Sequence, residues 1–189
     1  ISISLDIAAN NFKKNEKYQL SKNQKPISAE QLSNKLLKII NDYPIISIED
    51  PFSEDDIDYF VKFKDKSPSY LQIVGDDLVV TNTKLIKEAS EKKSINAALI
   101  KPNQIGTITE ALEALELSNK LGLMSILSAR SGETEDSFIS DLCVGWDVKQ
   151  IKVGSFSRSE RLSKWNQCLR IGEKLNRKYN MHDINIWRF

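Results

Sequence analysis

The chain has 189 residues, of which 27 are basic and 26 acidic, so its formal net charge at pH 7 is only +1. This balance argues against a nucleic-acid-binding domain, which would carry a basic excess on one face. Two cysteines, Cys143 and Cys168, are too few for a disulfide framework and favour a reduced, cytoplasmic protein.

The length suits one domain with a sizeable core. Apolar runs stay well below the roughly 18 residues that a membrane span needs, so we expect no membrane association. Ile1 already lies in an apolar stretch, without the basic-then-apolar order of a signal peptide. We therefore expect the chain to begin inside a larger protein.

Six short apolar runs rich in β-branched residues predict strands, at 1–9, 43–51, 70–78, 96–104, 123–131 and 149–155. Segments with helical periodicity separate them, and three are clear. Residues 28–43 begin with a capping-box pair, 107–122 end at a glycine, and 158–175 form the third. The lysine-rich residues 12–25 are expected to be a solvated connection. This alternation predicts an α/β chain with a parallel sheet covered by helices.

Each predicted strand ends near a polar residue with useful chemistry. A parallel barrel gathers such ends on one face, where barrel enzymes keep their active sites. The residues in chain order are Asp6, Glu49, Asp76, Lys101, Arg130 and Lys152. Three carboxylates suit Mg²⁺, three cations suit an anionic substrate, and a lysine in such a setting can act as a base. Alternatively, the residues are polar only because strands end at the surface, but their order, acids first and cations after, favours a site.

Several longer stretches resemble enolase, the glycolytic 2-phosphoglycerate dehydratase. They are SLDIAA, SIEDPF, QIVGDDL, VTNTKLI, IKPNQIGTITEA, RSGETEDSFISDL and QIKVGSFSRSERL, in the family's order from Asp6 to about Glu173. The resemblance implies the six C-terminal βα units of an enolase-type (β/α) TIM barrel, which is a partial barrel spanning residues 1–189. It also implies conversion of 2-phosphoglycerate to phosphoenolpyruvate with Mg²⁺, and a homodimer when the protein is intact.

The resemblance assigns roles residue by residue. Asp6, Glu49 and Asp76 match the magnesium ligands, and Lys101 matches the catalytic base. Arg130 and Ser131 match residues that hold the substrate phosphate, and Lys152 matches the lysine that faces the substrate carboxylate. Ser128, which opens the same motif as Arg130, completes the substrate-binding set.

Two departures qualify this assignment. The family motif of serine, histidine, arginine and serine is here Ser128, Ala129, Arg130 and Ser131, so the histidine that contacts substrate is missing. The one histidine of the chain, His182, is expected at the surface. The resemblance also implies parts that this chain does not supply: the small N-terminal domain, the first barrel strands, a mobile loop with a metal-binding serine, and the glutamate that acts as acid.

Two classes of function therefore stay open. The first is an enolase that needs the rest of the protein, and the second is an enolase-like scaffold or binding protein that has lost catalysis. Ala129 favours the scaffold, whereas retention of the metal acids, Lys101, Arg130 and Lys152 favours the enzyme. A different acid-sugar dehydratase or racemase is disfavoured, because such enzymes share the metal acids but not SGETED or PNQIGT.

Overall fold

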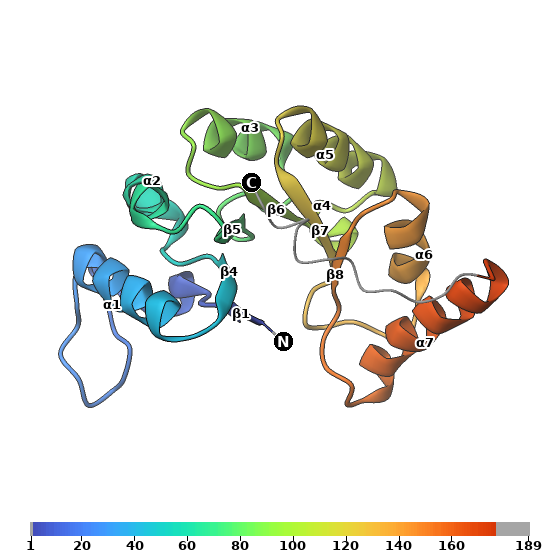
Figure 1. Ribbon diagram of the computed structural model, residues 1–189, viewed down its shortest axis with the longest axis horizontal. Coiled ribbons are helices and arrows are strands. Elements are labelled where there is room, and N and C mark those ends of the chain that lie inside the picture. Colours follow the sequence, from blue (N-terminus) through green and yellow to red (C-terminus); the bar gives the residue numbers. More distant parts are fainter. Residues whose placement is uncertain (1, 177–189) are drawn as a thin grey trace.

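The computed structural model describes residues 2–176. Six parallel strands lie side by side in chain order: β1 (Ile3–Asp6), β4 (Ile45–Glu49), β5 (Gln72–Gly75), β6 (Ala97–Ile100), β7 (Met124–Ser128) and β8 (Gln150–Lys152). Figure 1 shows that this sheet curls into a half-barrel, with β1 and β8 at its two edges and the helices on its outer side. The predicted partial (β/α) barrel is confirmed.

Helix separates each strand of the six-stranded sheet from the next strand of that sheet. The α-helices are α1 (Ala29–Asp42), α2 (Ile57–Lys66), α3 (Thr83–Glu91), α4 (Pro102–Ile105), α5 (Ile108–Lys120), α6 (Phe138–Gly145) and α7 (Ser159–Lys174). Short 3₁₀ turns occur at Ala9–Phe12 (η1) and Glu54–Asp56 (η2). The capping box predicted for α1 is present, since Ser28 Oγ accepts from Gln31 N at 3.2 Å and Gln31 Oε1 accepts from Ser28 N at 2.9 Å.

The main core lies between the sheet and the outer helices. Ile48, Ile73 and Leu127 point from the strands into this layer and are fully buried. Successive strand residues point to opposite faces, so Val74 and Ile126 lie on the inner side of the curl, in a second, smaller apolar cluster. The four central strands, β4 to β7, are buried on both faces, which explains their nearly continuous apolar sequences, whereas β1 and β8 at the edges of the sheet are more exposed.

The lysine-rich stretch after β1 is mostly exposed, as predicted for a solvated connection, but it also contains regular structure around one buried residue. It forms a two-stranded hairpin of β2 (Lys13–Lys14) and β3 (Lys17–Tyr18). Tyr18 is fully buried, donates its hydroxyl proton to Asp56 and accepts from Ser53 N at 2.9 Å. Burial and the bond to Asp56 raise the pKa of Tyr18. One aromatic anchor thus fixes a segment that composition alone marks as exposed.

The strands are shorter than their apolar runs in the sequence. After β6, for example, the chain turns directly into α4, whose first helical residue is Pro102, a position where the missing N–H costs nothing. Cys143 and Cys168 lie in α6 and α7 as free thiols. Between residues 2 and 176, no helix has the length and apolar character required to cross a bilayer. His182 lies outside the described residues.

Candidate functional site

The predicted site residues gather at the carboxyl ends of the six strands. Three of them, Asp6, Glu49 and Lys152, are the last residues of β1, β4 and β8, and two more, Asp76 and Lys101, each lie one residue beyond a strand. A cavity of about 390 Å³ opens here. Six of the eight predicted residues line it: Asp6, Asp76, Lys101, Ser128, Ser131 and Lys152.

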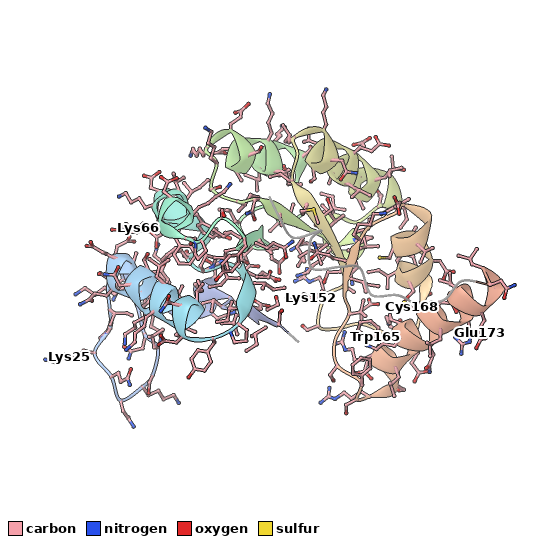
Figure 2. All side chains as sticks on the ribbon, in the orientation of Figure 1. Lys25, Lys66, Lys152, Trp165, Cys168 and Glu173 are labelled. Atoms are coloured by element: carbon pink, nitrogen blue, oxygen red, sulfur yellow. The ribbon has the colours of Figure 1, made fainter. Side chains whose placement is uncertain are left out.

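Lys152 joins the two ends of the curled sheet. Its Nζ donates to Asp6 Oδ2 at 2.8 Å and to Glu49 Oε1 at 2.7 Å. Figure 2 shows the lysine in the space that the curl encloses. Burial acts to lower the pKa of Lys152, but the two carboxylates outweigh it and the net pKa is raised. The lysine therefore stays charged and links the end of β8 to the ends of β1 and β4 through two ion pairs.

Lys101 makes a second ion pair in the same cavity. Its Nζ lies 2.5 Å from Asp76 Oδ2, and each of the two side chains is only 12% exposed. The backbone N–H of Lys101 donates to Thr81 Oγ1 at 2.9 Å, which fixes the start of the turn after β6. The geometry sets an ammonium group and a carboxylate from neighbouring strand ends in direct contact.

The negative charges of the acids in this site repel one another. Burial raises the pKa of Glu49 to about 7, Lys152 opposes that rise, and the charges of Asp6 and Asp76 add to it. Because repulsion and burial together outweigh the lysine, Glu49 is held in a site that disfavours its charged form. A cation placed among these acids would relieve that cost.

The donor set fits a hard metal ion. Asp76 Oδ1 is buried and has no hydrogen-bond partner within the described residues, although the other oxygen of the same carboxylate is paired. An unpaired buried carboxylate oxygen is costly and needs an explanation. Carboxylate oxygens are the ligands that Mg²⁺ prefers. Within the described residues, Asp76 has Asp50 and Asp77 as its nearby acids, whereas Asp6 and Glu49 are paired with Lys152. The assignment of Asp6, Glu49 and Asp76 as magnesium ligands therefore stays a prediction.

Asp50 is a residue of this region that the sequence interpretation missed. Its Oδ1 accepts from Asp76 N at 3.0 Å and its Oδ2 accepts from Asp77 N at 2.7 Å. Burial raises the pKa of Asp50 to about 7 in spite of these two bonds. Oxygens of Asp50, Asp76 and Asp77 lie within 4.8 Å of one another, which makes a triad of acids beside the cavity. Both Asp50 oxygens face backbone amides, so this residue holds the turn that carries Asp76.

Of the predicted residues at and just after the end of β7, Ser128 lines the cavity and Arg130 does not. Ser128 Oγ donates to Lys152 O at 2.8 Å, and Ala129 lines the cavity with a methyl group. Arg130 is exposed, its backbone N–H donates to Asn103 Oδ1 at 3.3 Å, and it lies outside the set of described residues that line the cavity. The chain has left β7 two residues before Arg130, and the phosphate-binding role that the resemblance gives to this arginine stays a prediction.

Arg161 of α7 is the cationic residue that lines the cavity in addition to the two predicted lysines. Its guanidinium Nη2 donates to the carbonyl of Ser131. It comes from a helix and not from a strand end, so a search restricted to strand ends could not find it. The arginine does lie within the stretch QIKVGSFSRSERL, which was the available signal.

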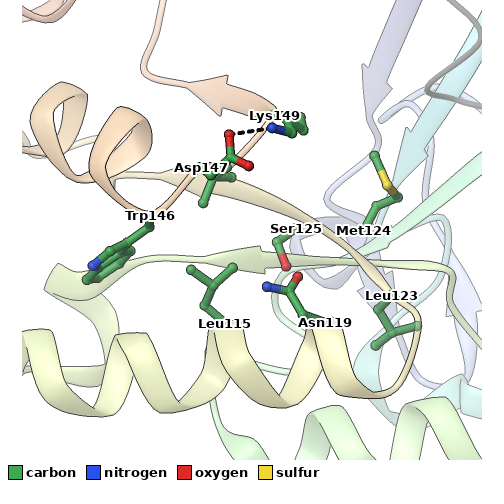
Figure 3. Close-up of a pocket in the computed structure, with 9 residues that line it drawn as sticks. Leu115, Asn119, Leu123, Met124, Ser125, Trp146, Asp147 and Lys149 are labelled. Atoms are coloured by element: carbon green, nitrogen blue, oxygen red, sulfur yellow. Dashed lines mark hydrogen bonds and ion pairs between the residues drawn. The ribbon is translucent and has the colours of Figure 1, made fainter.

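A second, smaller cavity of about 170 Å³ lies at the opposite end of the strands (Figure 3). Met124, the first residue of β7, and Lys149, just before β8, are part of its wall. Lys149 pairs with Asp147 at its edge. In parallel barrels this end serves stability and the carboxyl end serves chemistry, so we assign the candidate site to the larger cavity.

Comparison with known protein families agrees with this geometry. Residues 1–188 match the family described as Enolase, C-terminal TIM barrel domain. The matched range includes every strand of the half-barrel and every residue that lines the larger cavity. The chain therefore belongs to the enolase C-terminal TIM barrel family.

Proposed function

We propose that this protein is an enolase that dehydrates 2-phosphoglycerate to phosphoenolpyruvate with Mg²⁺, and that residues 1–189 are part of its catalytic barrel. One observation carries the proposal. Two carboxylates and two lysines from four different strand ends line one cavity, and a third carboxylate, that of Glu49, joins them through its ion pair with Lys152. Family membership supports the same reaction class.

The proposed reaction needs a base, placed beside cationic groups that stabilise the negative charge formed on the substrate. The proton next to the substrate carboxylate is weakly acidic, and its loss adds charge to that carboxylate. Lys101 would take this proton once its amine has given up its contact with Asp76. As the C=C bond forms, hydroxide would leave the neighbouring carbon as water, protonated by the acid that the family resemblance places outside residues 1–189. Lys152 would face the carboxylate, and Arg130 with Ser131 would hold the phosphate, where a planar guanidinium suits its oxygens. When bound, a magnesium ion held by Asp6, Glu49 and Asp76 supplies positive charge near the carboxylate.

A non-catalytic, enolase-like scaffold is the second candidate, and Ala129 is the observation that favours it. This residue lines the cavity, so the position of the missing family histidine faces the proposed substrate and offers only a methyl group. The scaffold predicts that the cavity residues are retained for structure, through ion pairs such as those of Lys152.

Turnover of 2-phosphoglycerate by the full-length protein distinguishes the enolase from the non-catalytic scaffold. We expect magnesium-dependent formation of phosphoenolpyruvate, followed by its ultraviolet absorbance. Lys101→Met should lower the rate by about 10²–10⁴-fold, the usual contribution of a general base. Lys120→Met, at the exposed end of α5, removes the same charge elsewhere and should leave the rate unchanged. A wild type that neither turns over nor binds 2-phosphoglycerate would establish the scaffold.

The metal assignment has its own test. Magnesium should raise the unfolding temperature of the wild type, because the ion binds only the folded arrangement of the three acids. Asp76→Asn should weaken that rise. A magnesium titration that is the same in wild type and variant would remove Asp76 from the ligand set.

A further inference from the structure

Lys164 of α7 is a buried lysine to which the proposed reaction gives no role. Its side chain is 0% exposed. Lysines are almost never fully buried unless they are paired. Lys164 Nζ donates to the carbonyl of Thr134 and to Glu160 O at 2.8 Å, and it lies 3.3 Å from Glu133 Oε2. Two of these three partners belong to the loop that follows β7.

That loop, residues 129–137, carries Ser131, which lines the larger cavity, and the exposed Arg130 next to it. Asn103 holds it from one side, donating to Glu133 Oε1 at 3.0 Å and accepting from Arg130 N. Glu133 therefore receives a donor on each oxygen, from Asn103 and from Lys164. These two interactions give Glu133 a structural role within the segment SGETED.

Arg161 holds the same loop one helical turn before Lys164. Residues three apart lie on one face of a helix, so the two cations point toward the same segment. Arg161 donates to the carbonyl of Ser131, and its aliphatic stem packs over Gly154. A Cβ atom at Gly154 would lie 2.5 Å from Arg161 Cδ, and the φ angle there is +98°. The glycine thus leaves the space in which the arginine stem lies.

We propose that Arg161 and Lys164 are positioning residues for anion binding: from α7 they fix the Ser131 and Thr134 carbonyls and Glu133, and so set Ser131 in the wall of the cavity and Arg130 next to it. The positioning of the loop stands on these contacts, whereas its consequence for substrate rests on the proposed function. Loop carbonyls without partners in a sheet or helix need donors from elsewhere, and α7 provides them. Arg161 also adds positive charge to the cavity, which favours an anionic ligand.

Limited proteolysis reports on the loop independently of activity. Arg130 is exposed, so an arginine-specific protease can cut between Arg130 and Ser131 once the loop leaves α7, and the fragment beginning at Ser131 is identified by mass spectrometry. In the full-length protein, Arg161→Met and Lys164→Met should each speed this cut about tenfold or more, because cleavage follows the population of the open loop. Each protein is digested well below its own unfolding temperature.

Arg170→Met is the matched control, since it removes a cation from the exposed part of the same helix. Its cleavage rate between Arg130 and Ser131 should equal that of the wild type. If Lys164→Met does not fold, Arg161→Met alone decides, because Arg161 is part-exposed and less central to packing. Unchanged cleavage in the variants that fold would overturn the proposal.

Substrate affinity gives a readout that a general loss of stability would not produce. In Arg161→Met and Lys164→Met, the KM for 2-phosphoglycerate should rise about tenfold while kcat changes less than threefold. The midpoint of a magnesium titration should stay within about twofold of the wild-type value. Both expectations follow because Lys101 and the predicted metal-binding acids lie at the ends of other strands. Equal weakening of magnesium and 2-phosphoglycerate binding would contradict positioning. A wild type without affinity for 2-phosphoglycerate refutes the proposed function, and the cleavage rates then still decide whether α7 holds the loop.

Discussion

Replacing Glu49 by glutamine should stabilise the metal-free protein. The carboxylate is 4% exposed, and its pKa rises from an ordinary 4.5 to about 7. At 1.36 kcal/mol per pKa unit, the charged form costs the folded state up to about 3 kcal/mol at and above neutral pH. Glutamine is neutral, has a similar shape and still offers Lys152 an oxygen. We expect a gain of about 1–3 kcal/mol, or roughly 3–10 °C in unfolding temperature for a chain of this size.

The pH dependence gives the sign of this effect. Because the folded-state pKa lies above the unfolded value, the stability that protonated Glu49 provides is fully present below about 4.5 and is lost as the pH rises through about 7. Thermal unfolding in EDTA should therefore show Glu49→Gln well above wild type at pH 8, with the gap closing toward pH 5. Glu116→Gln, exposed on α5, is the matched control. A variant less stable than wild type at pH 8 would refute this account of the site.

Three further substitutions test other parts of the structure. If the protein is an enolase, Ala129→His should raise its turnover about tenfold to hundredfold, the value of one hydrogen bond to a charged group, and leave magnesium affinity unchanged. Tyr18→Phe should cost about 1–3 kcal/mol in denaturant unfolding, because it leaves the N–H of Ser53 without its partner; the exposed Tyr70→Phe should cost nothing measurable. Gly154→Ala should lower the unfolding temperature, since its Cβ meets Arg161, whereas Gly132→Ala meets nothing within 4 Å and should be neutral.

The architecture was predictable because its signals are local and repeated. Strands buried on both faces have continuous apolar sequences, and a cap such as Ser28 with Gln31 identifies a helix start without knowledge of distant residues. Polar residues at strand ends then follow from the topology alone. This reasoning placed Asp6, Glu49, Asp76, Lys101 and Lys152 at the carboxyl ends of the strands, and the structure has them there.

The residues that were missed act through contacts that no local pattern encodes. Asp50 binds two backbone amides of a turn 26 and 27 positions away, and Tyr18 fixes its hairpin through partners 35 and 38 positions away. Arg161 reaches the cavity from a helix, where periodicity marks only which side is apolar. Arg130, by contrast, was predicted, and the structure places it two residues beyond the end of β7.

The ion pairs of Lys152 have a consequence for how the protein is made. Strands that pair in chain order give contacts of short sequence separation, so the strand-helix units can form one after another during synthesis. Lys152 instead reaches residues 146 and 103 positions back along the chain. The first acids of the cavity therefore leave the ribosome long before their cationic partner, and during that interval Asp6 and Glu49 meet solvent and free cations without it. The cavity gains its charge balance only when the last strand has been translated.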